Sequence, residues 1–211
     1  MKKALLFIVF LLVLGMTLGL TAGCGQDQAV EDTTPPADDA AEDDVDIYDF
    51  PENNEAMAQI LAIVTELGER LNERDGYYGD LHDVVVANGN RQGPEHAELY
   101  ALFNEWLYEV GATYLYSFID DGGDNNLIIV DGAEPEDMDP YGYEYPKEPW
   151  TVDAFATGEP QVAKTTWMDD YGYGLQKSAF APVYNSDGEI SFLLGIDYPV
   201  PQLEDYTEIM D

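Results

Sequence analysis

Residues 175–197 read LQKSAFAPVYNSDGEISFLLGID, and this stretch decides the fold class that the sequence predicts. Two runs with alternating apolar residues, Leu175 to Tyr184 and Ile190 to Asp197, flank the polar stretch Asn185 to Gly188. Asn, Asp and Gly are typical of tight turns, and a glycine adopts positive φ at the least steric cost. The segment therefore predicts a β-hairpin whose second strand ends in Gly-x-Asp.

Three further strands precede this hairpin. Thr113 to Ile119 and Leu127 to Val130 are rich in β-branched, aromatic and aliphatic residues, and Asp120 to Asn126 between them is a polar turn. This pattern predicts a second hairpin with a longer loop. Gln161 to Met168 is the fifth predicted strand, and a long aromatic and proline-rich loop from Asp131 to about Trp150 comes before it.

Helices are expected mainly before the strands. From Asn53 to Arg74, apolar residues recur at steps of three and four, which predicts one amphipathic helix. Pro94 to Val110 predicts a second helix, Asp83 to Ala87 is either a short helix or a strand, and Val152 to Thr157 is a short helix. The sequence thus predicts an α+β domain over residues 53–211. A long N-terminal helix and a second helix pack on one face of a five-stranded antiparallel sheet.

The composition excludes several classes of function. The 211 residues include 43 acidic and 8 basic ones, which gives a formal net charge of −35. So few basic residues cannot neutralise phosphates, and this excludes nucleic-acid binding. The single cysteine cannot form an internal disulfide or a thiolate metal cluster. Because 45% of the residues are hydrophobic and 12% aromatic, disorder over the whole length is excluded as well.

Residues 1–23 predict an export signal. Two lysines precede an apolar run, and the sequence from Thr21 to Cys24 resembles the lipobox of bacterial lipoproteins, although that family usually has Leu where Thr21 stands. The resemblance implies cleavage before Cys24 and lipidation of its thiol, which anchors the protein to a membrane. An ordinary signal peptide is the alternative. Residues 24–52 carry 11 acidic and no basic residues, and they predict a disordered tether.

The sequence from roughly Glu95 to Val200 resembles a Cache domain, the PAS-like extracellular sensor module of bacterial chemoreceptors, sensor kinases and cyclases. The hairpin that ends in Gly-x-Asp is the most specific part, and the other short pieces match in order and spacing. The matching pieces are Gly111 to Tyr116, Asp121-Gly122, the strand ending at Asp131, Ala156 to Gly158, Asp170 to Gly172, Ser178 to Tyr184, Ser186 to Gly188, and Leu194 to Asp197. The residues from Tyr198 to Asp211 are too few and too polar for the family's second membrane helix and output module, so we expect the domain to have no output module of its own. The resemblance therefore implies a ligand-binding module that signals through a partner.

The Cache resemblance also implies a ligand held between the sheet and the long loop by side chains of the central strands. Alternation along a strand places Tyr114, Tyr116 and Phe118 on one face. Lys177 is expected either to pair with a ligand carboxylate or to lie at the surface. Asp197 is expected either to receive a ligand amine or to stabilise the turn that follows it. The predicted ligand-binding residues are Tyr116, Trp150, Trp167, Tyr173, Lys177, Ser178 and Asp197.

No catalytic or metal-binding motif is recognisable in the sequence. His82 and His96 have no His or Cys companion at zinc-ligand spacing, and we predict that both are surface residues. The acidic stretches Asp120 to Asn126 and Asn185 to Glu189 fit hairpin turns better than calcium loops. We therefore expect no enzymatic activity, no cofactor and no metal centre.

The preferred hypothesis is a lipid-anchored extracytoplasmic protein that binds an organic acid, an amino acid or an amine for sensing. It would lie on the outer face of the cytoplasmic membrane or in the periplasm, and its partner would be a sensor kinase, a chemoreceptor or a transporter. Two alternatives remain. One is a structural or interaction lipoprotein with a ligand-free Cache-like fold, and the other is an acidic surface protein that binds divalent cations.

Salt is predicted to stabilise the folded domain. Residues 53–211 contain 32 acidic and 6 basic residues, so most of the negative charge lies on the folded part, where like charges repel one another. Raising the NaCl concentration from about 0.05 M to about 1 M screens this repulsion. We expect the melting temperature in scanning calorimetry to rise over that range, and a fall would contradict the prediction.

Overall fold

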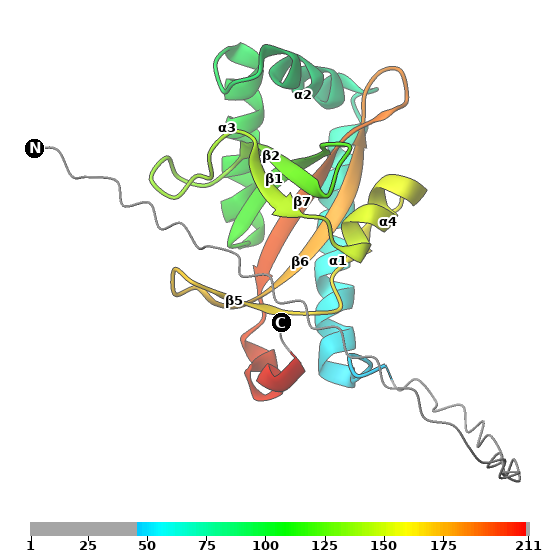
Figure 1. The fold of residues 1–211 in the computed structure, drawn as a ribbon, viewed down its shortest axis with the longest axis vertical. Coiled ribbons are helices and arrows are strands. Elements are labelled where there is room, and N and C mark those ends of the chain that lie inside the picture. Colours follow the sequence, from blue (N-terminus) through cyan, green and yellow to red (C-terminus); the bar gives the residue numbers. More distant parts are fainter. Residues whose placement is uncertain (1–45, 210–211) are drawn as a thin grey trace, which may run out of the picture. The chain divides into compact units, whose positions relative to one another are not determined.

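Seven strands form one antiparallel sheet in residues 46–209, the part of the chain that the structure, a computed structural model, describes (Figure 1). The export signal, Cys24 and residues 24–45 of the tether lie outside the described residues. The strands are β1 (Tyr114–Asp120), β2 (Asn125–Asp131), β3 (Tyr143–Pro146), β4 (Gln161–Val162), β5 (Trp167–Asp169), β6 (Gly174–Tyr184) and β7 (Ile190–Pro199). The helices are α1 (Pro51–Asn72), α2 (Tyr77–Asn88), α3 (Pro94–Val110), α4 (Pro149–Thr157) and the 3-10 helix η1 (Pro201–Ile209).

The strand order confirms the predicted α+β class and corrects the number of strands. The order is β3-β2-β1-β7-β6-β4, and β5 pairs with the other end of β6. Both predicted hairpins, β1–β2 and β6–β7, are present. The sheet has seven strands instead of five for two reasons: β3 lies inside the predicted long loop, and the predicted strand Gln161 to Met168 is divided into β4 and β5.

The division between β4 and β5 has a cause in the pairing register. Val162 pairs with Ala179, and Trp167 pairs with Gln176. Val162 and Trp167 are five residues apart, but their partners on β6, Ala179 and Gln176, are only three residues apart. Two residues of segment 163–166 are therefore looped out of the ladder. The hydrophobic pattern does not reveal such an insertion, because the residues on both sides of it have the composition of a strand.

Strand β6 buries both of its faces. Leu175, Ala179 and Val183 belong to the main core beneath α1, whereas Phe180 belongs to a smaller cluster on the opposite face of the sheet, together with Tyr116. The helix α4 contributes to this second cluster through Ala154. The sheet therefore separates a large core on the side of α1, α2 and α3 from a smaller one on the side of α4.

The helices agree closely with the predictions. The apolar stripe of α1 is buried, and α3 has the predicted bounds, Pro94 to Val110. The segment around Asp83 to Ala87 is helical and belongs to α2. The helix α1 approaches β6 closely because Gly68 faces Ala181. Within residues 46–209, no helix is both long and apolar enough to span a membrane.

Both histidines are buried, so the prediction that they are surface residues is wrong. His82 is fully buried on α2, its ring stacks on Phe192, and its Nε2 lies 2.9 Å from the Oγ of Ser117. Burial lowers the pKa of His82 to about 3, so the imidazole is neutral at physiological pH. His96 on α3 is 7% exposed. A buried serine on the inner face of β1 gives the His82 ring the polar partner that burial requires.

Substituting Gly68 by alanine is predicted to destabilise the domain by about 1–3 kcal/mol. A Cβ at this position would lie 2.7 Å from the Cβ of Ala181, and the added methyl group pushes α1 away from β6. Gly123→Ala is the matched control, because its Cβ would meet only the side chain of Asp121, at 3.3 Å. Urea unfolding followed by circular dichroism measures both variants. Equal free energies of unfolding for the two would contradict the close approach of α1.

Candidate functional site

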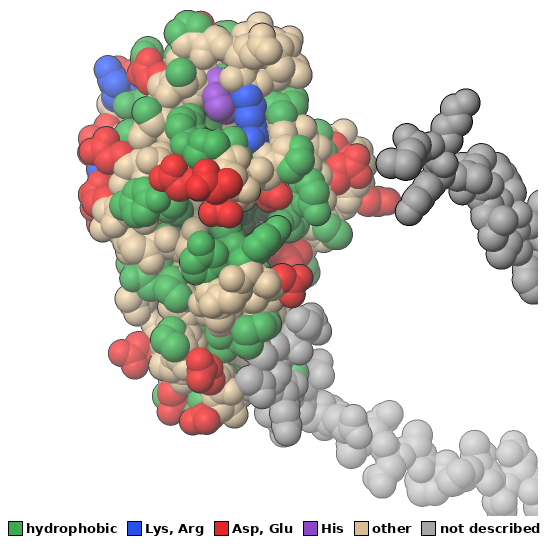
Figure 2. Space-filling model, turned by 90° about the vertical axis from the view of Figure 1, so that its left-hand side faces the viewer, with side chains coloured by type: hydrophobic (Ala, Val, Ile, Leu, Met, Phe, Trp, Pro, Cys, Tyr) green, Lys and Arg blue, Asp and Glu red, His purple; other side chains and the backbone are tan. Residues whose placement is uncertain are grey.

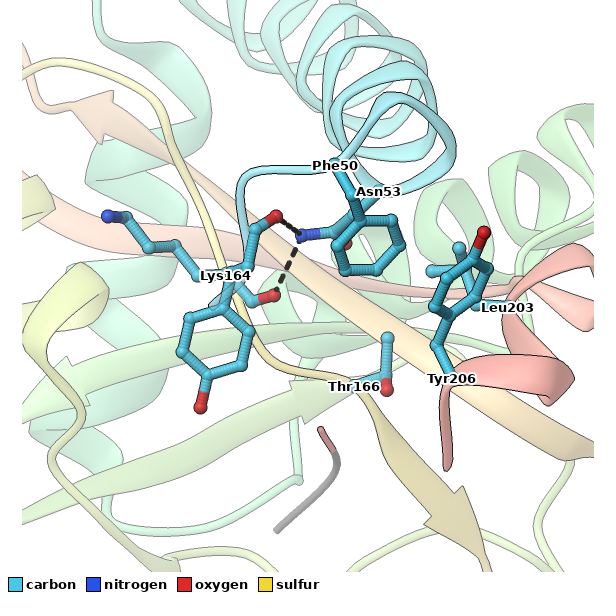
Figure 3. A pocket seen from close by; sticks show the side chains of 7 residues that line it. Phe50, Asn53, Lys164, Thr166, Leu203 and Tyr206 are labelled. Atoms are coloured by element: carbon cyan, nitrogen blue, oxygen red, sulfur yellow. Dashed lines mark hydrogen bonds between the residues drawn. The ribbon is translucent and has the colours of Figure 1, made fainter. Parts of the chain in front are cut away.

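A cavity of about 650 Å³ lies on the α4 side of the sheet. Its walls come from β1, β2, β6 and β7, from the segment between β2 and α4 together with the first turn of α4, and from β5 with the residues that flank it. The volume falls within the range of about 300–1,000 Å³ that is typical of small-molecule sites. A separate crevice of about 10 Å³ beside the N-terminal end of α1 (Figure 3) has room for no more than about one water molecule, so a solute fits the large cavity and not the crevice.

The cavity face of β1 carries three aromatic side chains. Tyr114, Tyr116 and Phe118 all line the cavity, which confirms the predicted alternation along this strand. Tyr116 pairs with Gly195 on β7. A side chain at residue 195 would collide with the Tyr116 ring, so the glycine lets this ring lie flat on the sheet.

The carboxylate of Asp197 is the polar centre of the cavity. Its Oδ1 accepts hydrogen bonds from the hydroxyl of Ser178 at 2.6 Å and from that of Tyr116 at 3.2 Å. The Oγ of Ser178 in turn accepts a hydrogen bond from the indole N–H of Trp167 at 3.2 Å. Register explains this arrangement, because Asp197 pairs with Ser178 on β6 and with Tyr114 on β1. The strands β1, β5, β6 and β7 therefore converge on one carboxylate.

Burial makes this carboxylate unusually basic. Asp197 is 6% exposed, and burial raises its pKa to about 7, although the hydrogen bonds from Ser178 and Tyr116 oppose that rise. Burial also raises the pKa of the Tyr116 hydroxyl, which keeps it a hydrogen-bond donor. Near neutral pH the Asp197 carboxyl group is therefore partly protonated and partly ionised. A bound cation would favour its ionised form.

A second carboxylate, that of Asp169, lies at the β5 end of the cavity. The hydroxyl of Tyr114 donates a hydrogen bond of 2.8 Å to its Oδ2, and the backbone N–H groups of Tyr171 and Tyr173 donate to its Oδ1 at 2.8 and 3.1 Å. The Tyr114 ring stacks on that of Trp167, with 6.4 Å between the ring centroids. Asp169 therefore fixes both the turn after β5 and an aromatic wall of the cavity.

Asp131 and Asp139 form an acidic group at the end of β2. Asp131 is 4% exposed and accepts hydrogen bonds from the backbone N–H groups of Ala133 at 2.9 Å and Asp139 at 2.7 Å. Burial raises the pKa of both carboxyl groups, and the neighbouring charge of Asp131 raises that of Asp139 further. Arg91 attracts both from outside the lining and partly offsets these rises.

The lining is strongly acidic. Among the residues that the structure shows around the cavity, Lys147 is the single cation. Its ammonium group bonds to Asp120 and to the carbonyl of Gly123 at 2.7 Å, and lies 3.9 Å from Asp121, so the turn before β2 already neutralises it. Acidic side chains are also spread over the outer face of the domain that Figure 2 shows. The seven carboxylates of the lining are Asp131, Asp137, Asp139, Glu148, Asp169, Asp170 and Asp197.

Five of the seven predicted ligand-binding residues come together around the cavity. They are Tyr116, Trp150, Trp167, Ser178 and Asp197. The indole N–H of Trp150, at the start of α4, is held by the side chain of Glu148. Tyr173 does not line the cavity: it is 56% exposed and packs edge-on against the ring of Tyr114 from outside.

Lys177 lies on the opposite face of β6 from the cavity. It is fully buried, and its ammonium group donates hydrogen bonds to the carbonyl oxygens of Ala163 at 3.1 Å, Lys164 at 2.9 Å and Thr165 at 2.9 Å. Its place is neither of the two that the sequence left open, since it neither lines the cavity nor lies at the surface. The physical reason is the break between β4 and β5, whose looped-out carbonyls need donors that the ladder does not supply.

Sequence reasoning missed Tyr114, Asp131 and Asp169 as lining residues. Tyr114 shares a face with Tyr116, so the strand alternation contained the signal for it. Asp131 ends the strand before the long loop. The sequence shows that position, but it does not show toward which face of the sheet the side chain points. Asp169 left no signal, because its place depends on the division of the predicted fifth strand.

No protein-family model matches the chain, and no curated protein matches it in sequence. Among solved structures, it is similar to the sensory domain of the Campylobacter jejuni chemoreceptor Tlp3, with a TM-score of 0.39 and 12% identity over 74% of this chain and 64% of that one. It is also similar to the ligand-binding domain of the Pseudomonas aeruginosa amino-acid chemoreceptor PctC in complex with GABA, with a TM-score of 0.37 and 16% identity over 75% of this chain and 64% of that one.

The extracellular domain of a histidine kinase, mmHK1S-Z2, is a third such structure, with a TM-score of 0.32 and 12% identity over 73% of this chain and 63% of that one. The first two neighbours are a sensory domain and a ligand-binding domain of chemoreceptors, and the third is the extracellular domain of a histidine kinase. The chain spans just under two thirds of their length.

Asp197→Asn is predicted to change the dependence of stability on pH. Because the folded state raises the pKa of Asp197 from 3.8 to about 7, the folded state holds the proton more tightly than the unfolded state does. This residue therefore destabilises the fold progressively as pH rises from about 4 to 7, by up to about 1.4 kcal/mol per pH unit. Asparagine has no such cost, so the melting temperature of the variant should gain on wild type across this window.

Thermal unfolding at pH 4, 5, 6, 7 and 8 measures the difference between variant and wild type. Asp187→Asn is the matched control, because Asp187 is an exposed residue in the turn between β6 and β7. We expect its difference from wild type to stay flat. A flat difference for Asp197→Asn as well would show that the Asp197 carboxyl is not held in a desolvated place.

Proposed function

We propose that the protein is a membrane-anchored extracytoplasmic sensor module that binds a small organic cation, an amine, in the cavity between the sheet and α4. The observation that carries this proposal is the buried carboxylate of Asp197 in a cavity of about 650 Å³ whose lining has seven carboxylates and one lysine. Of the three ligand classes that the sequence left open, organic acid, amino acid and amine, the cavity favours the last.

Electrostatics decides between these classes. A ligand carboxylate needs a cationic or N–H partner, and the ammonium group of Lys147 is already paired with Asp120. A ligand ammonium finds Asp197 at the centre of the cavity and Asp169 at one end. A buried carboxylate without a cationic partner is energetically unfavourable, because buried charges need to be paired. The ligand ammonium group would supply that partner and form an ion pair with Asp197.

The aromatic side chains support the same class of ligand. Tyr114, Tyr116 and Trp167 surround the Asp197 and Asp169 end of the cavity, and the faces of such rings attract ammonium groups. The rings also exclude water from the alkyl part of an amine. An inorganic cation gains little from them, so the lining suits an organic cation better than a divalent metal ion. Within the described residues, no group of three or more His, Cys, Asp and Glu side chains is placed to hold a metal ion.

The membrane anchor and the signalling partner are parts of the proposal that rest on the sequence. The lipobox-like residues from Thr21 to Cys24 support lipidation of Cys24, and residues 24–52 would act as the spacer between the membrane and the domain. The Cache resemblance supports a sensor kinase, a chemoreceptor or a transporter as the partner that receives the signal.

Amines are predicted to stabilise the protein against thermal unfolding, and carboxylates are not. We expect ethylamine, putrescine or choline to raise the melting temperature at pH 7.5, whereas acetate and succinate at equal ionic strength leave it unchanged. At about 100 times its dissociation constant, a ligand adds about 2.7 kcal/mol to the free energy of unfolding. Isothermal titration calorimetry then gives the affinity of the best amine.

Variants locate the binding site. Asp197→Asn and Trp167→Ala should weaken binding of the best amine at least tenfold, while the exposed-site control Asp187→Asn should leave it within about twofold. Stabilisation by acetate or succinate in place of the amines would overturn the ligand class. Absence of stabilisation by any of these compounds would favour the alternative of a ligand-free interaction domain.

A further inference from the structure

Segment 163–166 forms a wall between the ligand cavity and the crevice beside α1. Thr165 and Thr166 line the cavity, while Lys164 and Thr166 line the crevice. Figure 3 shows the crevice with Phe50, which precedes α1, and Asn53 from the first turn of α1 on one side and Tyr206 from η1 on another. Thr166 borders both spaces, so a shift of this segment at the cavity is also felt at the end of α1.

The wall owes its shape to one buried ammonium group. Two residues of the segment are looped out of the ladder, which leaves carbonyl groups without strand partners. Lys177 reaches them from the core side of β6, and its three N–H groups match the three carbonyls of residues 163–165 at 2.9–3.1 Å. No other side-chain type presents three donors at a single point, so the looped segment depends on a lysine at this position.

The segment is also tied to the first turn of α1. The carbonyl of Lys164 accepts a second hydrogen bond, from the Nδ2 of Asn53 at 3.3 Å, and the same amide group donates to the carbonyl of Tyr48 at 2.8 Å. Figure 3 shows both bonds as dashed lines. Asn53 is only 2% exposed. One carbonyl therefore joins β6, through Lys177, to the N-terminal end of α1.

On the cavity side, the segment leads directly to the polar centre. Trp167 follows it in the chain, and its indole N–H donates to Ser178, which donates to Asp197. Lys177 and Ser178 are adjacent on β6 and point to opposite faces of the sheet. Lys177 bonds the segment from the core side, and Ser178 accepts the hydrogen bond of Trp167 on the cavity side. A displaced segment would thus move Trp167 away from the carboxylate.

We propose that Lys177 is a positioning residue that holds segment 163–166 as a wall of the ligand cavity, and that this segment links the cavity to the N-terminal end of α1. Lys177 touches no ligand in this arrangement and acts through Thr165, Thr166 and Trp167. The link to α1 is a property of the fold. Only the effect on ligand affinity rests on the proposed function.

The first test compares Lys177→Met with Asn72→Ala by hydrogen–deuterium exchange. Asn72 is the matched control because it also joins α1 to β6, by bonding to the carbonyl of Pro182 at 3.1 Å and the N–H of Tyr184 at 3.0 Å, but at the far end of the helix. In Lys177→Met we expect exchange of the amides of residues 163–169 to rise at least tenfold, together with those at the start of α1. Asn72→Ala should leave both regions within about twofold of wild type. Unchanged exchange of residues 163–169 in Lys177→Met would overturn the proposal.

The second test is a double-mutant cycle between Lys177 and Asn53, which also serves if Lys177→Met alone is too unstable for exchange measurements. If Lys177→Met is too unstable, the cycle uses Lys177→Arg instead, which keeps the positive charge but not the geometry of three donors at one point. Because both side chains bond the Lys164 carbonyl, their effects on the unfolding equilibrium constant should be non-additive by at least threefold. The cycle of Lys177 with Asn72 should be additive. Additivity in both cycles would overturn the link to α1.

The third test uses putrescine as the probe for ligand affinity. We expect the putrescine dissociation constant of Lys177→Met to be at least tenfold higher than that of wild type and that of Asn72→Ala to be unchanged. Equal affinities for Lys177→Met and wild type would overturn the positioning role. If wild type binds no putrescine, that result counts against the proposed function, while the exchange measurements and the cycles still decide whether Lys177 and segment 163–166 form the link.

Discussion

Strand β6 has to bury both of its faces, and the rest of the structure depends on that constraint. Nine consecutive residues of this strand, Leu175 to Val183, are buried. Its one face receives α1, which can approach because Gly68 meets Ala181, and its other face forms the floor of the cavity at Ser178 and Phe180. A shift in register by one residue would exchange the two faces, placing Lys177 in the cavity and Ser178 under the helix.

Two neighbouring residues of β6 show how the domain accommodates buried charge. Lys177 is an ammonium group without a carboxylate partner, and three carbonyl groups satisfy it. Asp197, on the other face, is a carboxylate without a cation, and two hydroxyl groups satisfy only part of its hydrogen-bonding capacity. The first group is complete within the protein, whereas the second is left able to bind a cation. The carboxylate of Asp197, and not the ammonium group of Lys177, is therefore the charged group that is available to a ligand.

The helices and the two hairpins could be predicted because local patterns specify them. The apolar stripe of α1, the proline and glycine at the ends of α3 and the turn before Glu189 each lie within a few residues of the element they define. The five candidate ligand-binding residues that line the cavity all lie on strands or at the start of a helix. The errors fall where pairing between distant segments decides the outcome, at β3, at the break between β4 and β5, and at the buried His82.

The sequence by itself determined the acidic character of the chain, its α+β class and the hairpin of β6 and β7, because charge, periodicity and turn residues are local properties. The structure extends the second strand of that hairpin past Asp197 to Pro199. Only the tertiary structure decided which acidic residues enclose a cavity, and that Lys177 belongs to the core. A side chain takes its role from what the other strands and helices place against it. For Lys177 that is a pair of looped-out residues, which are visible only once β4, β5 and β6 are aligned.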